Sequence, residues 1–316
     1  MAFEIRPYRG TDEADLLAVW AASMTHDRIT PDIFRTKVLL DPNFTPENLP
    51  VAVVDGTLAG FCLGLTRHVP LFLQGLEPDK AWITAFGVHP DYRRQGIGAA
   101  LFAHLSERFQ ADGRAQIDLS PYVPNYFVPG VDIHAYSDTV AWLEKHAGFK
   151  KLYEAISMGA DLTGFQIPPE IAAHEQRIFE EHGVTIKPVT AADLPDLKPF
   201  ILKHFGWDWV RHASDYLLEI FGDSPHQICF LVARQHGEVI GYCQQRRERF
   251  GPFGVDPAKR NLGIGRVLLF RCLAEMSARH NYYAYFLWTG EDAARLYSLA
   301  GFKRRRVFAV LRKTFN

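Results

Sequence analysis

Two glycine motifs of one type carry the clearest chemical prediction in this sequence. The pattern Val-x-Pro-x-x-Arg-x-x-Gly-x-Gly occupies residues 88–98 and recurs 167 residues later at 255–265. Glycine lets a bound group approach the backbone, and the first turn of a helix offers unpaired amide N–H groups at the positive end of the helix dipole. Each motif therefore predicts a cradle for an anion such as a pyrophosphate.

The residues around both motifs predict the elements that such a cradle needs. Apolar runs at Ala81–Val88 and Phe250–Val255 precede the glycines and favour strands. Apolar residues at helical spacing follow each loop, namely Leu101, Phe102, Leu105 and Phe109 in the first copy and Leu268, Leu269, Cys272 and Met276 in the second. The sequence thus predicts a strand, a glycine loop and a helix twice.

Two other phosphate-binding motifs are excluded by the residues that follow the glycines. A Walker P-loop needs Gly-Lys-Ser/Thr, whereas the chain has Gly98-Ala99 and Gly265-Arg266. A dinucleotide-binding loop needs a third glycine, which is missing from both copies.

Further repeats place the motifs in two similar domains. Ile5-Arg6-Pro7 recurs as Ile186-Lys187-Pro188, and Gly60-Phe61-Cys62 recurs as Gly241-Tyr242-Cys243, both 181 residues later. We predict a first domain at residues 1–166, a helical connector at 167–183 and a second domain at 184–316. Hairpin turns are expected at Asp55-Gly56 and His236-Gly237.

Composition limits the classes of partner. The 35 basic and 36 acidic side chains leave a formal charge of -1, which offers no long-range attraction for nucleic acid or an anionic membrane. The first residues do not resemble a signal peptide, and the four cysteines show no C-x-x-C spacing. We expect a cytoplasmic protein with core thiols. The histidine spacing predicts no metal site.

The repeated glycine motif resembles the coenzyme A pyrophosphate motif of the GNAT acetyltransferase superfamily. This resemblance covers nearly the whole chain outside the connector. It implies an α/β fold of the α+β, mixed-sheet kind, with two tandem GNAT acyl-CoA N-acyltransferase domains. Acetyl-CoA would be the cosubstrate, lying where the fourth and fifth strands of each domain diverge.

The resemblance also implies which residues contact the coenzyme. Backbone groups of the fourth strands would pair with the pantetheine arm, and the loops would hold the pyrophosphate. Arg93 and Arg260 would add a charged contact or brace the loop. The predicted coenzyme-binding residues are Phe86, Val88, Arg93, Arg94, Gln95, Gly96, Ile97 and Gly98 in the first copy, and Phe253, Val255, Arg260, Asn261, Leu262, Gly263, Ile264, Gly265 and Arg266 in the second.

The resemblance assigns a general acid to the second copy. The family's acid is the tyrosine of a Tyr-x-x-x-Gly-Phe motif, and Tyr297 occupies that position. A phenol is protonated at neutral pH and can protonate a departing thiolate. A packing role for Tyr297 is the alternative. The first copy has Glu144 at this position, so Tyr122, Tyr126 or Tyr136 would have to substitute.

The general base is less clearly marked. Glu248 lies at the entry to the second copy's fourth strand, where bases of this family often lie. The neighbouring Arg246, Arg247 and Arg249 favour a surface ion-pair cluster as the alternative.

The resemblance implies an N-acetyltransferase that moves the acetyl group of acetyl-CoA to the primary amine of a small metabolite by direct attack. One alternative is a regulatory module that binds acetyl-CoA without turnover. Another is a protein N-acetyltransferase, although a near-neutral chain has no general attraction for basic tails.

Overall fold

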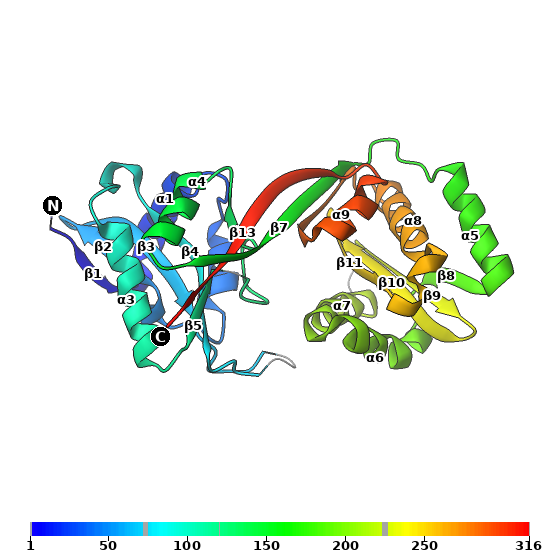
Figure 1. The fold of residues 1–316 in the computed structure, drawn as a ribbon, viewed down its shortest axis with the longest axis horizontal. Helices are drawn as coiled ribbons and strands as arrows, with labels where there is room; N and C mark the ends of the chain where they lie inside the picture. The colour runs from blue at the N-terminus through cyan, green and yellow to red at the C-terminus, as the bar shows by residue number, and fades with distance from the viewer. Residues whose placement is uncertain (1, 72–74, 120, 223–226, 316) are drawn as a thin grey trace. The chain divides into compact units, whose positions relative to one another are not determined.

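The chain is described here by a computed structural model that covers residues 2–71, 75–119, 121–222 and 227–315. It divides into two compact units. The first consists of Met1–Ala155 with Val307–Asn316, and the second of Ile156–Arg306. Within each unit, helices cover a mixed sheet, and Figure 1 labels most of these elements.

The sheet of the first unit has the strand order β1-β2-β3-β4-β5-β13, and β6 pairs with β13. Strands β4 and β5 are parallel, whereas the other neighbours are antiparallel. The strands are β1 (Glu4–Pro7), β2 (Pro50–Val54), β3 (Thr57–Leu65), β4 (Lys80–Val88), β5 (Gln116–Leu119), β6 (Val131–Asp132) and β13 (Lys303–Thr314).

Helices cover both faces of this sheet. They are α1 (Glu13–Ser23), α2 (Pro31–Phe34), α3 (Ile97–Ala111) and α4 (Ser137–Lys145). Side chains alternate along β3, so that Phe61 and Leu63 pack in the cluster formed with α1, whereas Cys62 packs in the cluster formed with α3. The sheet therefore lies between two apolar layers.

The second unit repeats this arrangement with the strand order β7-β12-β11-β10-β9-β8. Its one parallel pair among these neighbours is β11 with β12. The strands are β7 (Lys150–Asp161), β8 (Val184–Pro188), β9 (Ile228–Gln235), β10 (Glu238–Arg246), β11 (Arg249–Val255) and β12 (Tyr283–Thr289). The predicted fourth strands thus correspond to β4 and β11.

The helices of the second unit are α5 (Pro169–His182), α6 (Leu194–Phe205), α7 (Trp207–Ile220), α8 (Ile264–Ala278) and α9 (Glu291–Ser298). Helices α6 and α7 pack on one side of the sheet, and α8 packs on the other. The segment predicted as a helical connector forms α5. Its Ile171 and Ile178 are buried in the same cluster as α8, so α5 is part of the second unit's core.

Equivalent contacts in the two units support the internal repeat. A Cβ atom on Gly60 would lie 3.1 Å from the carbonyl oxygen of Gly87 and 3.3 Å from Leu101 Cδ1. A Cβ atom on Gly241 would lie 3.2 Å from both the Gly254 carbonyl oxygen and Leu268 Cδ1. In both copies, the missing side chain lets the helix after the glycine loop pack closely on the sheet.

The predicted hairpin turns are confirmed. Asp55 and Gly56 have φ of 48° and 81°, and His236 and Gly237 have φ of 51° and 88°. Two successive positive φ angles match the twist of an antiparallel hairpin. The turns join β2 to β3 and β9 to β10.

The two units differ from the predicted ranges 1–166 and 184–316 at the last strand of each copy. Residues 156–161 of β7 belong to the second unit, where β7 pairs with β12. Residues 307–314 of β13 belong to the first unit, where β13 pairs with β5 and β6. Each sheet is therefore completed by the closing strand of the other copy.

This strand exchange predicts that a mutation near the C-terminus destabilises the first unit. Leu311 is fully buried among residues of the α3 cluster. Leu311→Ala should cost about 2–5 kcal/mol because it leaves a cavity. Amide hydrogen exchange should accelerate in β4 and β5. Acceleration confined to β11 and β12 would contradict the exchange.

Candidate active site

The first glycine loop joins the end of β4 to α3. Gly96 is the N-cap of α3 with φ of 84°, a left-handed conformation that favours glycine, and no side chain caps the helix. A Cβ atom on Gly98 would have Val88 Cγ2 at 3.8 Å as its nearest neighbour. The first-turn amides of α3 can therefore meet an anion directly.

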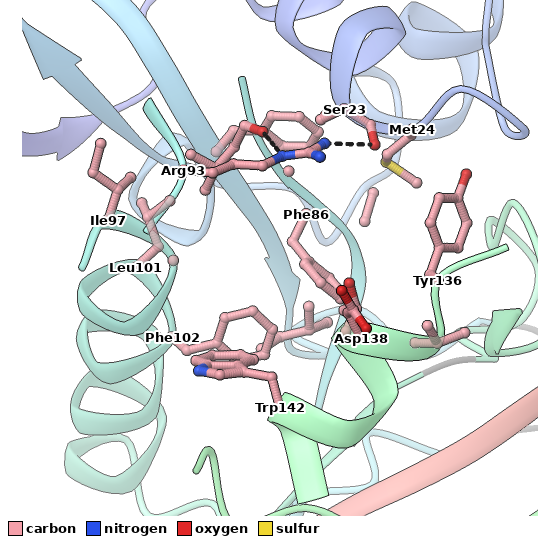
Figure 2. Close-up of a pocket in the computed structure, with 18 of the residues that line it drawn as sticks. Ser23, Met24, Phe86, Arg93, Ile97, Leu101, Phe102, Tyr136, Asp138 and Trp142 are labelled. Carbon is pink, nitrogen blue, oxygen red and sulfur yellow. Dashed lines mark hydrogen bonds between the residues drawn. The ribbon is translucent and has the colours of Figure 1, made fainter. Parts of the chain in front are cut away.

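Arg93 braces this loop. Its Nε donates to the carbonyl oxygen of Val88 at 3.1 Å, and its second guanidinium nitrogen donates to the carbonyl oxygen of Ser23 at 3.5 Å (Figure 2). The guanidinium thus joins the end of β4 to the end of α1 and keeps a positive charge beside the loop. Of the two roles predicted for Arg93, the structure shows the bracing one.

Strands β4 and β5 diverge beside the loop. Among the described residues, the last pair that joins them is Ile83 with Leu119, whereas β4 continues to Val88. Thr84, Phe86 and Val88 lie on this diverging part and line the cavity described next. A chain that enters the gap can pair with β4 as an added strand.

A cavity of about 780 Å³ occupies the gap. It extends from the first turn of α3 past Phe86 to Tyr136 and Trp142 (Figure 2). Phe102 meets both Phe86 and Trp142 edge to face, with ring centroids 4.9 and 5.4 Å apart. This volume is typical of small-molecule sites, and the wall suits the apolar part of a ligand.

At the second glycine loop, a side chain from α5 lies against the backbone at Leu262 and Gly263. Gly263 is the N-cap of α8 with φ of 71°. The Nε2 atom of His174 on α5 lies 3.0 Å from the carbonyl oxygen of Leu262, within hydrogen-bonding distance. A Cβ atom on Gly263 would lie only 2.4 Å from the same Nε2. The equivalent position on Gly96 has no atom within 4 Å.

Tyr297 lies in an aromatic cluster of the second unit. Its ring centroid is 4.3 Å from that of Phe286, 5.6 Å from that of Phe253 and 6.0 Å from that of Phe250. Burial raises the pKa of the phenol above its ordinary value, so it keeps its proton at neutral pH. These contacts are compatible with an acid and with a packing role.

Glu248 lies away from the second glycine loop. It occupies the exposed turn between β10 and β11, and its carbonyl oxygen accepts a hydrogen bond from the Tyr285 amide at 2.9 Å. The glycine loop follows the other end of β11. The neighbouring Arg246 pairs with Glu219 at 2.8 Å. Glu248 thus lies at the entry to β11, as the sequence indicated, and its role as a general base stays a prediction.

The remaining residues that were predicted to contact the coenzyme lie near the N-termini of α3 and α8. Ile97 and Ile264 are buried, so only their backbone groups can face a ligand. Arg94 lines the cavity with its side chain 89% exposed, and Gln95 donates to the Asp91 carbonyl oxygen. In the second unit, Arg260, Asn261 and Leu262 form the short helix before Gly263, and Gly265 and Arg266 begin α8.

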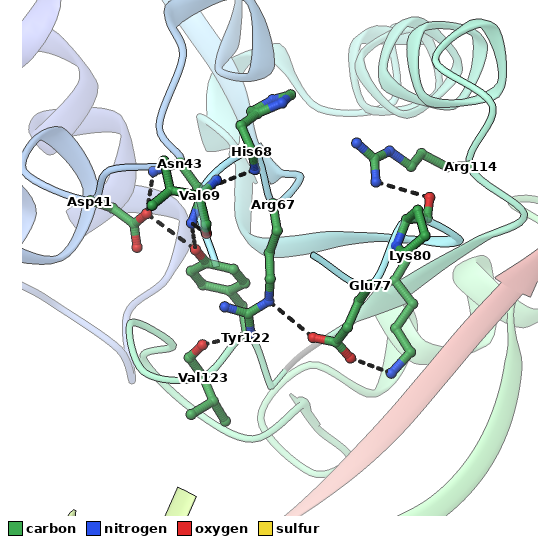
Figure 3. Close-up of polar contacts among 11 residues, drawn as sticks. Asp41, Asn43, Arg67, His68, Val69, Glu77, Lys80, Arg114, Tyr122 and Val123 are labelled. Carbon is green, nitrogen blue, oxygen red and sulfur yellow. Dashed lines mark hydrogen bonds and ion pairs between the residues drawn. The ribbon is translucent and has the colours of Figure 1, made fainter. Parts of the chain in front are cut away.

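Among the three alternative tyrosines of the first copy, Tyr136 lines the cavity, together with Asp27 and Thr84. Neither Asp27 nor Thr84 belongs to a sequence motif, so the sequence does not mark them as site residues. Tyr122 is fully buried: its hydroxyl donates to Asp41 and accepts from the Asn43 amide, both at 3.1 Å (Figure 3).

The network around Tyr122 anchors the loop that leads to the cavity. The Asn125 side chain also donates to Asp41, at 2.7 Å. Arg67 donates to Glu77 at 2.9 Å and to the Val123 carbonyl oxygen at 2.8 Å (Figure 3). The inserted segment at 121–137 is thus fixed at its start and supplies cavity residues near its end.

Comparison with known proteins identifies the family. Residues 17–126 and 194–302 each match the acetyltransferase (GNAT) family. The chain belongs to this family. It is 26% identical to an acetyltransferase of Yersinia pestis over 129 aligned residues. This alignment covers 40% of this chain and 82% of the Yersinia protein. It is 28% identical over 117 residues to an acetyltransferase of Sodalis glossinidius, and this alignment covers 37% of this chain and 73% of the Sodalis protein.

Solved structures show the same fold over the whole chain. A tandem GNAT protein from the clavulanic acid biosynthesis pathway aligns with a TM-score of 0.62 at 15% identity, covering 99% of this chain and 98% of that one. A glucosamine N-acetyltransferase region of a fungal multi-domain β-N-acetylglucosaminidase aligns with a TM-score of 0.78 at 20% identity. The alignment covers 98% of this chain but 38% of the fungal one. These likenesses confirm the predicted tandem GNAT fold.

Other observations complete the description of the site. In the described part of the chain, no three histidine, cysteine or carboxylate side chains are gathered in a way that could hold a metal ion. The four cysteines are buried and free of disulfides. No helix within the described ranges is long and apolar enough to cross a membrane.

A matched pair of substitutions compares the two glycine loops. Gly98 and Gly265 are both the second residue of their helix, and a Cβ atom on either would meet only ordinary contacts, at 3.8 Å and at 3.6–3.9 Å. Glutamate at this position suits the helix dipole but repels a pyrophosphate. Gly98→Glu should weaken coenzyme A binding at least ~100-fold, because like charges in contact cost several kcal/mol.

Gly265→Glu is the control and should change coenzyme affinity by less than about twofold, since a site that does not bind the ligand cannot affect its affinity. Calorimetry should give one coenzyme per chain. The opposite pattern, with binding lost in Gly265→Glu alone, would contradict the assignment of the site to the first loop.

Proposed function

We propose that the chain is an N-acetyltransferase that uses acetyl-CoA and acts on the primary amine of a small molecule. We further propose that the first unit is the productive one. The observation that carries this proposal is the open cavity at the first glycine loop, which continues from an uncapped helix start into the gap between β4 and β5.

The residues of the first unit suit the three parts of acetyl-CoA. The α3 amides, Arg93 and Arg94 would meet the pyrophosphate. The backbone from Phe86 to Val88 would pair with the pantetheine arm. The thioester would then lie deeper in the cavity, near Thr84. The predicted contacts at the second loop stay a prediction, and the His174 contact argues that binding there requires α5 to move.

We propose direct transfer. The amine nitrogen, after losing a proton, attacks the carbonyl carbon of the thioester, and the carbon–sulfur bond breaks as the tetrahedral intermediate collapses. The thiolate takes up a proton, which leaves an N-acetylated amine and free coenzyme A. Direct transfer needs no nucleophilic side chain, and one thiol is released for each amide that forms.

A second candidate is transfer at the second unit with Tyr297 as general acid. The observation that favours it is the buried ring beside Phe253, where the phenol keeps its proton. Glu248 would be its base. For this candidate, the covered second loop would have to open.

Tyr297→Phe separates the two candidates. The substitution deletes one hydroxyl and keeps the ring contacts, so turnover at the first unit should stay above about half of the wild-type rate. An acid at this position would contribute about 10²–10⁴-fold. The measurement is thiol release at saturating acetyl-CoA with a panel of primary amines, with the melting temperature followed in parallel. A loss within that range at an unchanged melting temperature would assign the chemistry to the second unit.

A further inference from the structure

The cavity of the first unit carries opposite charges on different residues. Arg93 and Arg94 belong to the glycine loop, where phosphates would bind. Two carboxylates also line the cavity, those of Asp27 and Asp138. The Asp138 side chain is 92% exposed and lies 3.9 Å from Arg94. Asp27 is half-buried and lies in the segment between α1 and α2. Asp27 is therefore the carboxylate better placed to meet a ligand away from solvent.

Hydrogen bonds hold Asp27 at two points. The Tyr136 hydroxyl donates to Asp27 Oδ2 at 2.9 Å and accepts from the backbone amide of His26 at 3.1 Å. The indole Nε1 of Trp20 donates to the Asp27 carbonyl oxygen at 2.8 Å. Tyr136 comes from the segment before α4 and lies across the cavity from α3 (Figure 2). Because its partners fix it, the carboxylate needs little reorganisation to receive a ligand.

A second polar residue, Thr84, lines the same cavity. Thr84 follows Ile83, the last residue of β4 with a β5 partner among the described residues, and Thr84 is 7% exposed. Its hydroxyl oxygen is buried and has no hydrogen-bond partner among the described residues. A buried hydroxyl left without a partner costs about 1–3 kcal/mol, which a bound polar group would recover. Thr84 thus points to a ligand at the level where the sheet begins to diverge.

We propose that Asp27 receives the ammonium group of the acceptor and takes one proton from it before the nitrogen attacks, with Tyr136 positioning the carboxylate and Thr84 as a polar contact near the thioester. This inference rests on the proposed function and names the substrate class, a small molecule with a protonated primary amine. Two N–H bonds of the ammonium group break. The first proton passes to the Asp27 carboxylate and frees the lone pair, and the second leaves the nitrogen of the tetrahedral intermediate as the departing thiolate takes up a proton. The N–C bond forms, the C–S bond breaks, and Asp27 gives its proton to water, so that an ammonium ion and a thioester become an amide, a thiol and one proton.

The test compares Asp27→Asn with the wild-type protein on two kinds of amine. Ethanolamine, putrescine and glucosamine are protonated at neutral pH, whereas p-anisidine, an aromatic amine, is not. Removing a general base typically costs about 10²–10⁴-fold. Asp27→Asn should lower kcat/KM by this factor for the protonated amines and clearly less for p-anisidine, since its nitrogen has a free lone pair before it binds. Coenzyme A affinity should stay within about twofold, because Asp27 meets the acceptor.

Asp32→Asn is the matched control, because Asp32 carries the same charge on α2 with its side chain 90% exposed, and it is not among the residues that line the cavity. It should leave all rates unchanged. Tyr136→Phe should also lower kcat/KM more for the protonated amines than for p-anisidine, but by a smaller factor than Asp27→Asn. Equal losses for both kinds of amine in Asp27→Asn would indicate general damage and overturn the proposal.

The outcomes separate this inference from the proposed function. A wild-type protein that acetylates p-anisidine or binds acetyl-CoA but accepts none of the protonated amines would overturn the role of Asp27 and leave the coenzyme site standing. A protein that binds no acetyl-CoA would overturn the proposed function, and the inference with it.

Discussion

The divergence of β4 from β5 after Ile83 is the constraint on which the first site depends. If the two parallel strands stayed paired along their whole length, the backbone N–H and C=O groups that face each other would all be hydrogen-bonded between them. Because β5 ends at Leu119 while β4 continues to Val88, part of β4 is left beside a cavity. The same divergence places the start of α3 at the cavity, so one gap offers both a strand edge and an anion cradle.

The two units use this plan differently. Their sheets diverge at equivalent places and their glycine loops share one motif. In the second unit, α5 places His174 against Leu262 and Gly263 and packs Ile171 and Ile178 into the core. Phe205 also lies where a Cβ atom on Gly254 would be, whereas the small side chain of Ser23 occupies this place beside Gly87. We infer that the second unit serves as a structural partner, and the strand exchange gives each sheet its closing strand from the other copy.

Local patterns made the strands, the glycine loops and the hairpin turns predictable, because each depends on residues that are near in sequence. The strand exchange was not predictable in this way. Residues 150–161 and 303–314 both end a copy of the repeat, and either pattern could complete either sheet. The cover on Gly263 depends on His174, 89 residues earlier in the chain, and no motif marks that contact. Asp27 and Thr84 are recognisable as site residues only in the folded chain, where the first helix lies beside β4 and both residues line one cavity.

The most direct test of this account is a crystal structure of the protein with coenzyme A at a concentration well above its dissociation constant. The account predicts the pyrophosphate on the amides that follow Gly96 and the pantetheine arm beside Phe86–Val88, with His174 still in place over Gly263. Coenzyme A bound at Gly263 and Gly265, with the cavity beside Gly98 empty, would contradict the assignment of the active site to the first unit.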